Sequence, residues 1–462
     1  GKALTEGNEN TGIGYRALLA ATTGDENTAV GHSALAAVTT ASDNTAVGSN
    51  AGGSITTGTL NTFIGHLTGD ATTTANDNTG IGAASMSGNT TGTRNTAVGS
   101  DSLKVSTTGN DNTAIGKGAL TANTTASNNT AVGKNSLTAN TTGTTNVAVG
   151  TEALENNTTA SENTAVGYKA LEANTTGATN TAVGDRALAS NTTAANNTAV
   201  GNNALIENTT GGANTAVGGS ALDACTTGSN NTAIGKDALT AVTTASSTTA
   251  IGFAAGAALT TGSENTAIGF QALDAATTSN SNTAIGHTSM TTMTSGSQNV
   301  AVGKGTLHSA TSSTNCVAVG LNALITSTTG SNNTSVGMNS MFANTTGGSN
   351  VAIGGSALVA NTTASNNIAI GNDALAANTT GADNVAVGTA ALDANTTADG
   401  NTAVGSSALG ANTTGADNVA MGEAALLSNT TAANNTGIGT SALRANTTGA
   451  ENVAVGADAG TA

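Results

Sequence analysis

Apolar and polar positions return in the same order every seventeen residues along this chain. From Asn10 to Gly456 the rows of seventeen contain no insertion or deletion. A Gly stands at one fixed position in all 27 rows, and Val or Ile precedes it in 26 of them. Asn opens 25 rows, and Leu or Met follows four residues after the Gly in 23 rows. Such a gapless period predicts a repeat architecture in which each row is one structural unit.

The positions of a row are numbered here from its opening Asn, so that in the row 163–179 Asn163 holds position 1. Residues 163–166 read as a short β-type run that ends at Gly167, and residues 177–179 close the row with a turn. A second extended piece is predicted to open at 170–171 and to continue toward 174–176. Regular Gly, paired Thr and clustered Asn disfavour helix, and no row carries a helical apolar stripe.

Two extended pieces and two turns per row predict an all-β fold, a parallel β-solenoid of about 27 coils. Neighbouring strands lie about 4.8 Å apart, so each residue stacks on its copy in the next coil. We expect ladders of Val and Asn, with the Asn side chains hydrogen-bonding along the axis. The repeated Gly is expected to allow a backbone angle or a close approach that other residues cannot adopt.

The short strand is apolar on both faces. Ala165 and Val166 point to opposite sides because side chains alternate along a strand. One side can face the interior of the coil, whereas the other needs a neighbour. We therefore infer a homo-oligomer with the chains side by side.

The run Asn-Thr-Ala-Val-Gly-x-x-Ala, as at 163–170, resembles the YadA-like head repeats of trimeric autotransporter adhesins and similar phage tail-fibre repeats. This resemblance covers essentially the whole chain and implies a left-handed β-roll in a homotrimeric rod. It also implies an extracellular location, on a cell or virion surface. The family's repeat has about fourteen residues, and the three extra residues here lie around the Asn-Thr-Thr turn. The first coil keeps a spacing of fourteen from Ala3 to Ala17.

These observations divide the chain into an irregular first coil at 1–9, a continuous solenoid at 10–456 and a terminal segment at 457–462, where we expect a truncated row. Solenoids normally carry caps, and neither end shows an obvious one. End-to-end association into a longer filament therefore stays open as an alternative.

Composition narrows the classes of partner. Aromatic residues make up 1 % of the chain, 8 % of residues are charged, and the net charge is −16. Only 11 Lys and Arg are scattered along 462 residues, which disfavours nucleic acid and anionic membranes as partners. No apolar run is long enough to span a bilayer, so we expect no membrane insertion within this chain.

No catalytic, cofactor-binding or metal-binding residues are predicted, and the protein is not expected to be an enzyme. Cys225 and Cys316 are more than five coils apart, too far for a disulfide within the chain. The histidines have no metal-ligand spacing, and we expect turn residues; they are His32, His66, His287 and His308. Phosphate-binding loops and local Ser-His-Asp motifs are also absent from the sequence.

Two further groups of residues have alternative readings. Acidic residues precede the opening Asn in several rows, where a solvated turn is favoured over a Ca²⁺ site; they include Asp25, Glu26, Asp43, Asp77, Asp111, Glu162, Glu264 and Glu451. Asn-Thr-Thr recurs in 14 rows, from Asn89 to Asn446, and each is formally an N-glycosylation acceptor. Hydrogen bonding in a turn explains the motif unless the source is a secreted eukaryotic protein.

The leading functional hypothesis is a fibrous structural protein, the shaft of an extracellular adhesin or phage tail fibre that attaches to surfaces multivalently. The receptor is unknown. Binding is expected at the variable positions, such as Tyr168-Lys169, Asp185-Arg186, Glu172, Ile206 and Phe342. One alternative is an ice-binding solenoid with stacked Thr-Thr pairs, although adjacent residues leave only one outward Thr file. Another alternative is a subunit of an end-to-end filament.

Overall fold

The structure is a computed structural model that describes residues 5–461 of the chain. Over this range the regular structure consists of short parallel strands, one in each row of seventeen residues. Helix is absent from the described residues, so none of them belongs to a helix that could cross a membrane. The prediction of an all-β, parallel β-solenoid with a 17-residue repeat is therefore confirmed.

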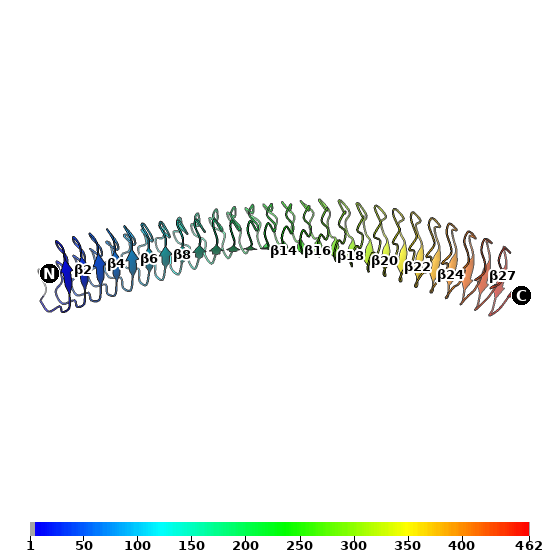
Figure 1. Ribbon diagram of the computed structural model, residues 1–462, viewed down its shortest axis with the longest axis horizontal. Helices are drawn as coiled ribbons and strands as arrows, with labels where there is room; N and C mark the ends of the chain where they lie inside the picture. Colours follow the sequence, from blue (N-terminus) through cyan, green and yellow to red (C-terminus); the bar gives the residue numbers. More distant parts are fainter. Residues whose placement is uncertain (1–4, 462) are drawn as a thin grey trace. The chain divides into compact units, whose positions relative to one another are not determined.

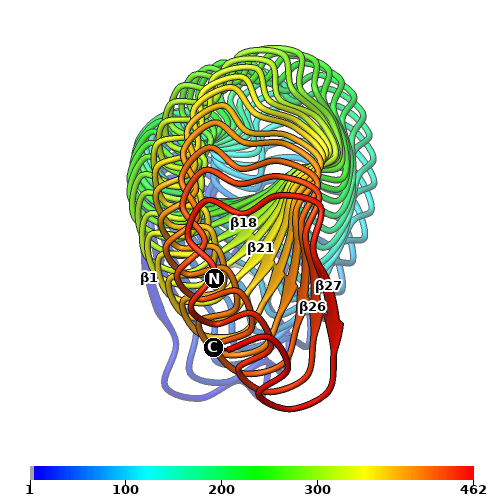
Figure 2. The same cartoon turned by 90° about the vertical axis from the view of Figure 1, so that its right-hand side faces the viewer.

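The chain divides into two compact units, Gly1–Asn230 and Asn231–Ala462. Within each unit every strand pairs in parallel with the next strand in the sequence, and the strands lie side by side in chain order (Figure 1). In the second unit, β26 and β27 lie one behind the other when the coils are viewed end-on (Figure 2). Identical repeat positions face each other, as in the pairs Thr164–Thr181, Ala165–Ala182 and Val166–Val183. The predicted stacking of each residue on its own copy is thus confirmed.

The first unit contains β1 (Thr11–Ile13), β2 (Thr28–Val30), β3 (Thr45–Val47), β4 (Thr62–Ile64), β5 (Thr79–Ile81), β6 (Thr96–Val98), β7 (Thr113–Ile115), β8 (Thr130–Val132), β9 (Val147–Val149), β10 (Thr164–Val166), β11 (Thr181–Val183), β12 (Thr198–Val200) and β13 (Thr215–Val217). The second unit contains β14 (Thr232–Ile234), β15 (Thr249–Ile251), β16 (Thr266–Ile268), β17 (Thr283–Ile285), β18 (Val300–Val302), β19 (Val317–Val319), β20 (Thr334–Val336), β21 (Val351–Ile353), β22 (Ile368–Ile370), β23 (Val385–Val387), β24 (Thr402–Val404), β25 (Val419–Met421), β26 (Thr436–Ile438) and β27 (Val453–Val455).

The Gly after each strand meets both of the expected requirements. Gly167 follows β10 with φ of 138°, a conformation that residues with a side chain rarely adopt. A Cβ added to it would also collide with the backbone carbonyl of Gly184 in the next coil. Any larger residue at position 5 would therefore both strain the backbone and separate two coils.

The predicted second extended piece at 170–176 is wrong, because the backbone from 168 to 173 forms turns. The amide of Ala170 donates to the carbonyl of Gly167 at 3.4 Å, and that of Asn174 donates to Leu171 at 3.2 Å. Lys169 and Leu171 take φ values of 56° and 54°. A left-handed residue costs about 1–2 kcal/mol. Burial of a Leu side chain is worth about 1.5–3 kcal/mol and offsets this cost at position 9.

Few large side chains fill the interior of each coil. In the row 163–179 the buried apolar residues are Ala165, Ala170 and Leu171, each with no exposed surface. Asn163 and Asn174 are equally buried. Since a buried amide is costly without partners, these Asn residues must be hydrogen-bonded for the coil to be stable.

Both buried Asn positions form ladders along the axis. The side-chain nitrogen Nδ2 of Asn174 donates to Oδ1 of Asn157 at 3.0 Å and to the backbone carbonyl of Gly177 at 2.9 Å. Asn180, at position 1, donates to Oδ1 of Asn163 in the previous coil and to the carbonyl of Ala194, fourteen residues further along its own row. The predicted Asn ladders are confirmed. Asn supplies a donor and an acceptor from one side chain, which a ladder requires.

Position 13 carries Thr in every complete row, a regularity with a structural cause. The hydroxyl of Thr175 donates to the carbonyl of Thr192 at 3.0 Å, and its backbone amide donates to the same oxygen at 2.9 Å. The neighbouring Thr176 is exposed. Each Asn-Thr-Thr turn therefore contributes one hydrogen-bonded Thr and one outward Thr, in agreement with the single outward file expected from the sequence.

Compensating side chains explain three of the four glycines that replace Leu at position 9, namely Gly52, Gly69 and Gly256. Phe63 is fully buried at position 3, where most rows have Ala. A Cβ on Gly69 would lie 2.6 Å from Cε1 and from Cζ of Phe63, and one on Gly52 would lie 3.2 Å from its Cδ2. The Phe63 ring thus occupies the space of missing Leu side chains. Ile55 and Leu259, buried at position 12, accompany Gly52 and Gly256 in the same way.

The start of the described region already follows the regular period. The amide of Thr5 donates to the carbonyl of Thr22, seventeen residues away, at 3.1 Å. The spacing of fourteen expected from Ala3 involves a residue that lies outside the described range, as do the rest of residues 1–4 and Ala462.

Candidate binding surfaces

The outward side of the strands forms the first candidate surface. We call it the strand face and define it by positions 2 and 4, which Thr164 and Val166 hold in β10. Ala165, between them, is fully buried, so the two residues point away from the coil interior. At position 4, Val149 and Val183 are 37 % and 36 % exposed. The strand face is therefore half-exposed and carries apolar groups in every coil.

The strand face is free of charge. Position 4 is Val or Ile in all rows except that of Met421, and position 2 is Thr, Val or Ile. Within the 27 rows every charged residue stands at positions 6, 7, 10, 11, 16 or 17. An acidic chain that excludes charge from one side of every coil leaves that side suited to contact with an uncharged surface.

A second candidate surface lies where the chain turns inward after each strand. Positions 8 and 9, such as Ala170 and Leu171, are buried, so a hollow remains between the outward residues at positions 7 and 10. We call this hollow the turn groove. Side chains bridge it in several coils: the hydroxyl of Thr121 donates to the carbonyl of Asp101 at 3.0 Å, and Nζ of Lys104 lies 2.8 Å from Oδ1 of Asp101.

Among the described residues of the first unit, the turn groove widens into surface cavities, two of which have distinct linings. One has a volume of about 280 Å³ and is lined by small, polar or aliphatic residues, among them Ser33, Asn50 and Asp70. Burial raises the pKa of the Asp70 carboxyl. The other cavity, of about 310 Å³, spans three coils. Its lining includes Tyr168, Lys169, Glu172, Arg186, Ile206 and Glu207.

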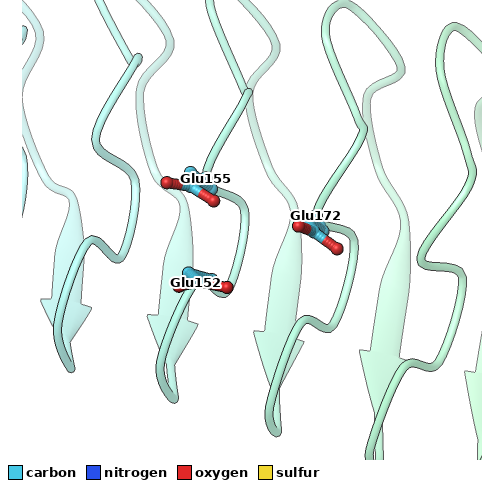
Figure 3. Close-up of side chains that lie close together, drawn as sticks. All are labelled: Glu152, Glu155 and Glu172. Carbon is cyan, nitrogen blue, oxygen red and sulfur yellow. The ribbon is translucent and has the colours of Figure 1, made fainter.

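Beside the larger cavity three glutamates come together. The carboxylates of Glu152, Glu155 and Glu172 lie within 4.8 Å of one another, the first two on one coil and the third on the next (Figure 3). Nζ of Lys169 lies 3.5 Å from Glu152 and 2.8 Å from Glu172. Partial burial, together with the charges of Glu152 and Glu172, raises the pKa of the Glu155 carboxyl.

Carboxylates in this arrangement could hold a divalent cation, but an ammonium group already lies among them. The hydrogen bond to Glu172 raises the pKa of Lys169, so the ammonium form of Lys169 is stabilised. A metal ion would have to displace this group. The cluster is best described as an ion-pair network at the rim of the turn groove.

Five of the binding residues suggested by the sequence line one cavity of the first unit. Tyr168, Lys169, Glu172, Arg186 and Ile206 all line the larger cavity. Asp185 is paired with Arg186, with 3.4 Å between Oδ1 and Nε. Phe342 belongs to the second unit, where it is 37 % exposed.

Sequence reasoning did not identify Glu152, Glu155 or Glu207. The seventeen-residue period could have identified the first two. Glu155 shares position 10 with Glu172 of the next coil, and Glu152 shares position 7 with Lys169 of the next coil.

The remaining candidate residues are structural. Cys225 and Cys316 are buried free thiols, and burial raises the pKa of Cys225 to about 11. Burial also raises the pKa of Cys316. Such thiols are poor nucleophiles and poor metal ligands.

The histidines at position 6 are exposed turn residues, as expected. Two of them stack on an aromatic ring of the previous coil: His32 on Tyr15 at 5.4 Å and His287 on Phe270 at 5.1 Å between ring centroids. His308 is half-buried and its Nδ1 lies 3.2 Å from the carbonyl of Thr288.

The acidic residues before the opening Asn occupy a left-handed turn. At position 17, Glu26, Asp43 and Asp77 are exposed and have φ values between 57° and 61°. Asp and Asn tolerate this conformation better than most residues, which accounts for their frequency here. Arg94 holds the same position and pairs with Asp111 in the next coil, 2.6 Å from Nε to Oδ1.

The Asn-Thr-Thr motifs are unsuited to glycosylation of the folded protein. Of the 14 Asn residues, all but Asn446 are fully buried. Their amides are engaged in the ladder described above. These hydrogen bonds support a structural role for the Asn-Thr-Thr motif in its turn, whatever the source of the protein.

Comparison of the sequence with protein-family models gave no match, and comparison with curated proteins gave none either. The resemblance to adhesin and tail-fibre repeats consequently stands on the residues of the repeat alone.

Proposed function

We propose that this protein is a non-enzymatic structural fibre, in which copies of the chain associate side by side through their strand faces. The observation that carries the proposal is the uncharged, half-exposed strand face, repeated in register in coil after coil. Burying Val and Ile side chains that are now about one-third exposed is favourable.

A second copy of the same chain is the occupant that fits this face best. Each coil presents the same apolar groups at one fixed spacing, about 4.8 Å. Only a partner with the same spacing can match this array over many coils, and a copy of the chain has it by construction. Most soluble oligomers are also homo-oligomers with closed symmetry. We propose a homotrimer on the strength of the resemblance to adhesin head repeats.

The biological role proposed for the trimer is that of an extracellular shaft, in an adhesin or a phage tail fibre. The scaffold positions are almost invariant between rows, whereas positions 6, 7 and 10 vary widely and face outward. A shaft of this kind supports reach and presents many copies of a weak binding site, which raises the overall affinity for a surface.

Sedimentation velocity with light scattering tests the association directly. We expect a mass of three times 43.7 kDa. The triple variant Val149→Glu, Val166→Glu, Val183→Glu should dissociate or weaken the oligomer. Its matched control places Glu on the exposed Thr residues of the same three coils, Thr159, Thr176 and Thr193, and should remain trimeric. A monomeric wild-type protein would contradict the proposal.

A second candidate function is ice binding, and it uses the same surface. Thr occupies position 2 in eight consecutive strands, β1 to β8, beside the Val or Ile of position 4. Hydroxyl and methyl groups thus form a regular array. Ice binding requires this face to be open to water, whereas the fibre requires it to be covered. Thermal hysteresis in a dilute solution of monomeric protein would favour ice binding, and its absence would remove this candidate.

A further inference from the structure

The larger cavity of the turn groove has a lining that differs from the rest of the chain. Four of its eight lining residues are charged, in a protein in which 8 % of residues are charged. It also contains Tyr168, one of six aromatic residues in the whole sequence. The smaller cavity occupies the same repeat positions but has no aromatic residue and one charged residue, Asp70. The lining is therefore a local feature and not a consequence of the repeat.

The charges of the residues that line this cavity are balanced. Lys169 and Arg186 contribute two cations, and Glu172 and Glu207 contribute two carboxylates. Glu152 and Glu155 add negative charge at the rim. An anionic ligand would be repelled by the carboxylates, and a cationic one would meet the ammonium and guanidinium groups. A neutral ligand with many hydroxyl groups avoids both costs.

Several polar groups remain available to such a ligand. Arg186 approaches Asp185 through Nε at 3.4 Å, a distance that leaves its terminal nitrogens as donors. Glu207, one coil further on, offers two acceptor oxygens. Tyr168 lies two coils from Glu207, is 45 % exposed, and has Nζ of Lys169 at 5.6 Å from its ring centroid. Donors, acceptors and an aromatic ring thus line one hollow across three successive coils.

We propose that the cavity lined by Tyr168, Arg186 and Glu207 binds a neutral hexopyranose unit of a surface glycan. A hexopyranose has a face of C–H groups that can pack against the tyrosine ring. Its hydroxyl groups both donate and accept, and so match a guanidinium beside a carboxylate. A cavity of about 310 Å³ is at the lower end of the range for small-ligand sites and suits one sugar unit.

This inference rests on the proposed adhesive function, which it deepens by naming the class of receptor. One open cavity per chain should bind a single sugar weakly. Three copies on a trimer would raise the affinity for a glycan-covered surface by multivalency.

Saturation-transfer NMR on the intact protein tests the site, with the methyl glycosides of glucose, galactose, mannose and N-acetylglucosamine as probes. At least one should show saturable binding, whereas methyl glucuronide and methyl glucosaminide, which carry a charge, should bind more weakly. Tyr168→Ala and Glu207→Gln should each reduce the affinity at least about ten-fold. The matched control is Tyr15→Ala, the other tyrosine at position 6, which should have no effect.

Failure of all four neutral glycosides to bind would overturn the inference, as would binding that Tyr168→Ala and Tyr15→Ala reduce equally. Because all three substituted side chains lie at the surface, unchanged circular dichroism should accompany every variant. Sedimentation separates this inference from the fibre function. A trimer that binds none of the sugars refutes only the site, and a monomer that binds them refutes only the fibre.

Discussion

Oδ1 of Asn163 accepts two hydrogen bonds from Asn180, one coil further on, from the backbone nitrogen at 2.9 Å and from Nδ2 at 3.2 Å. One side-chain oxygen thus joins two coils at a point that water does not reach. A buried acceptor that loses its donor costs about 1–3 kcal/mol. The ladder therefore stabilises the fold mainly because breaking it leaves buried polar groups unpaired, which lowers the free energy of unfolding.

Replacing Asn180 by Ala should destabilise the neighbouring coils by about 1–3 kcal/mol, since the buried backbone N–H of Asn197 loses its acceptor. Oδ1 of Asn163 and the carbonyl of Ala194 also each lose one of two donors. Stability in a long repeat array is local, so amide hydrogen exchange is the appropriate measurement. Exchange should accelerate in residues 163–197. The control, Asn202→Ala at an exposed turn position, should leave exchange unchanged. Equal effects of the two substitutions would contradict the ladder as a source of stability.

Position 15 supports a second prediction, because it is Gly in most rows and Ala or Ser in the others, and no two adjacent coils both carry a Cβ there. A Cβ on Gly177 would collide with the carbonyl of Ala194 in the next coil. Gly177→Ala should therefore destabilise by about 1–3 kcal/mol, as overpacking does. Ala194→Gly removes a methyl group without a clash and should cost only about 0.5–1 kcal/mol. Proteolysis at increasing denaturant would rank the two; a milder effect for Gly177→Ala would refute the packing argument.

The Phe63 substitution allows a double-mutant cycle. Gly69→Leu restores the residue that most rows have at position 9, yet its Cβ would lie 2.6 Å from the Phe63 ring. We expect a loss of about 1–3 kcal/mol in the local unfolding free energy. In a Phe63→Ala background the same change should stabilise, because the new Leu fills the cavity that the ring leaves. The sign reversal is the test, and additive effects of the two changes would exclude the compensation.

A pH dependence is expected at Asp274, whose carboxyl has its pKa raised by burial. Below the ordinary pKa of an Asp carboxyl, Asp274 is protonated in both the folded and the unfolded chain, and it does not lower the stability. As pH rises through the folded-state pKa, the folded chain must ionise in a less hydrated place, and stability falls. Asp274→Asn should therefore stabilise at pH 7 and have no effect at about pH 3.

Asp111 provides a control of opposite sign for this experiment. The hydrogen bond from Arg94 lowers the pKa of the Asp111 carboxyl. Asp111→Asn should consequently destabilise slightly at pH 7, and its effect should disappear as the pH falls through the folded-state pKa. Thermal melts at the two pH values would check both variants. The same sign for both would show that burial does not set the behaviour of Asp274.

The sequence by itself determined the parallel solenoid, the ladders of Asn163 and Asn174, and the need for Gly167. These features follow from local rules, because a gapless period forces each residue onto its own copy, and only certain residues tolerate that stacking. Strand alternation alone determined that Ala165 and Val166 point to opposite sides, and only the structure decided that Ala165 faces the interior and Val166 the outside.

Only the tertiary structure decided the conformation of 168–173, the partners of Phe63 and the lining of the larger cavity. Leu171 adopts a left-handed backbone that its own preferences oppose, and it does so because the turn delivers its side chain to the core. Gly69 replaces the usual Leu because the Phe63 ring fills the space that a Leu side chain would occupy. Tyr168 and Glu207 are 39 residues apart in sequence and line one hollow because the coils stack. Contacts between rows depend on how the side chains of neighbouring coils pack together, which the residue pattern of a single row does not specify.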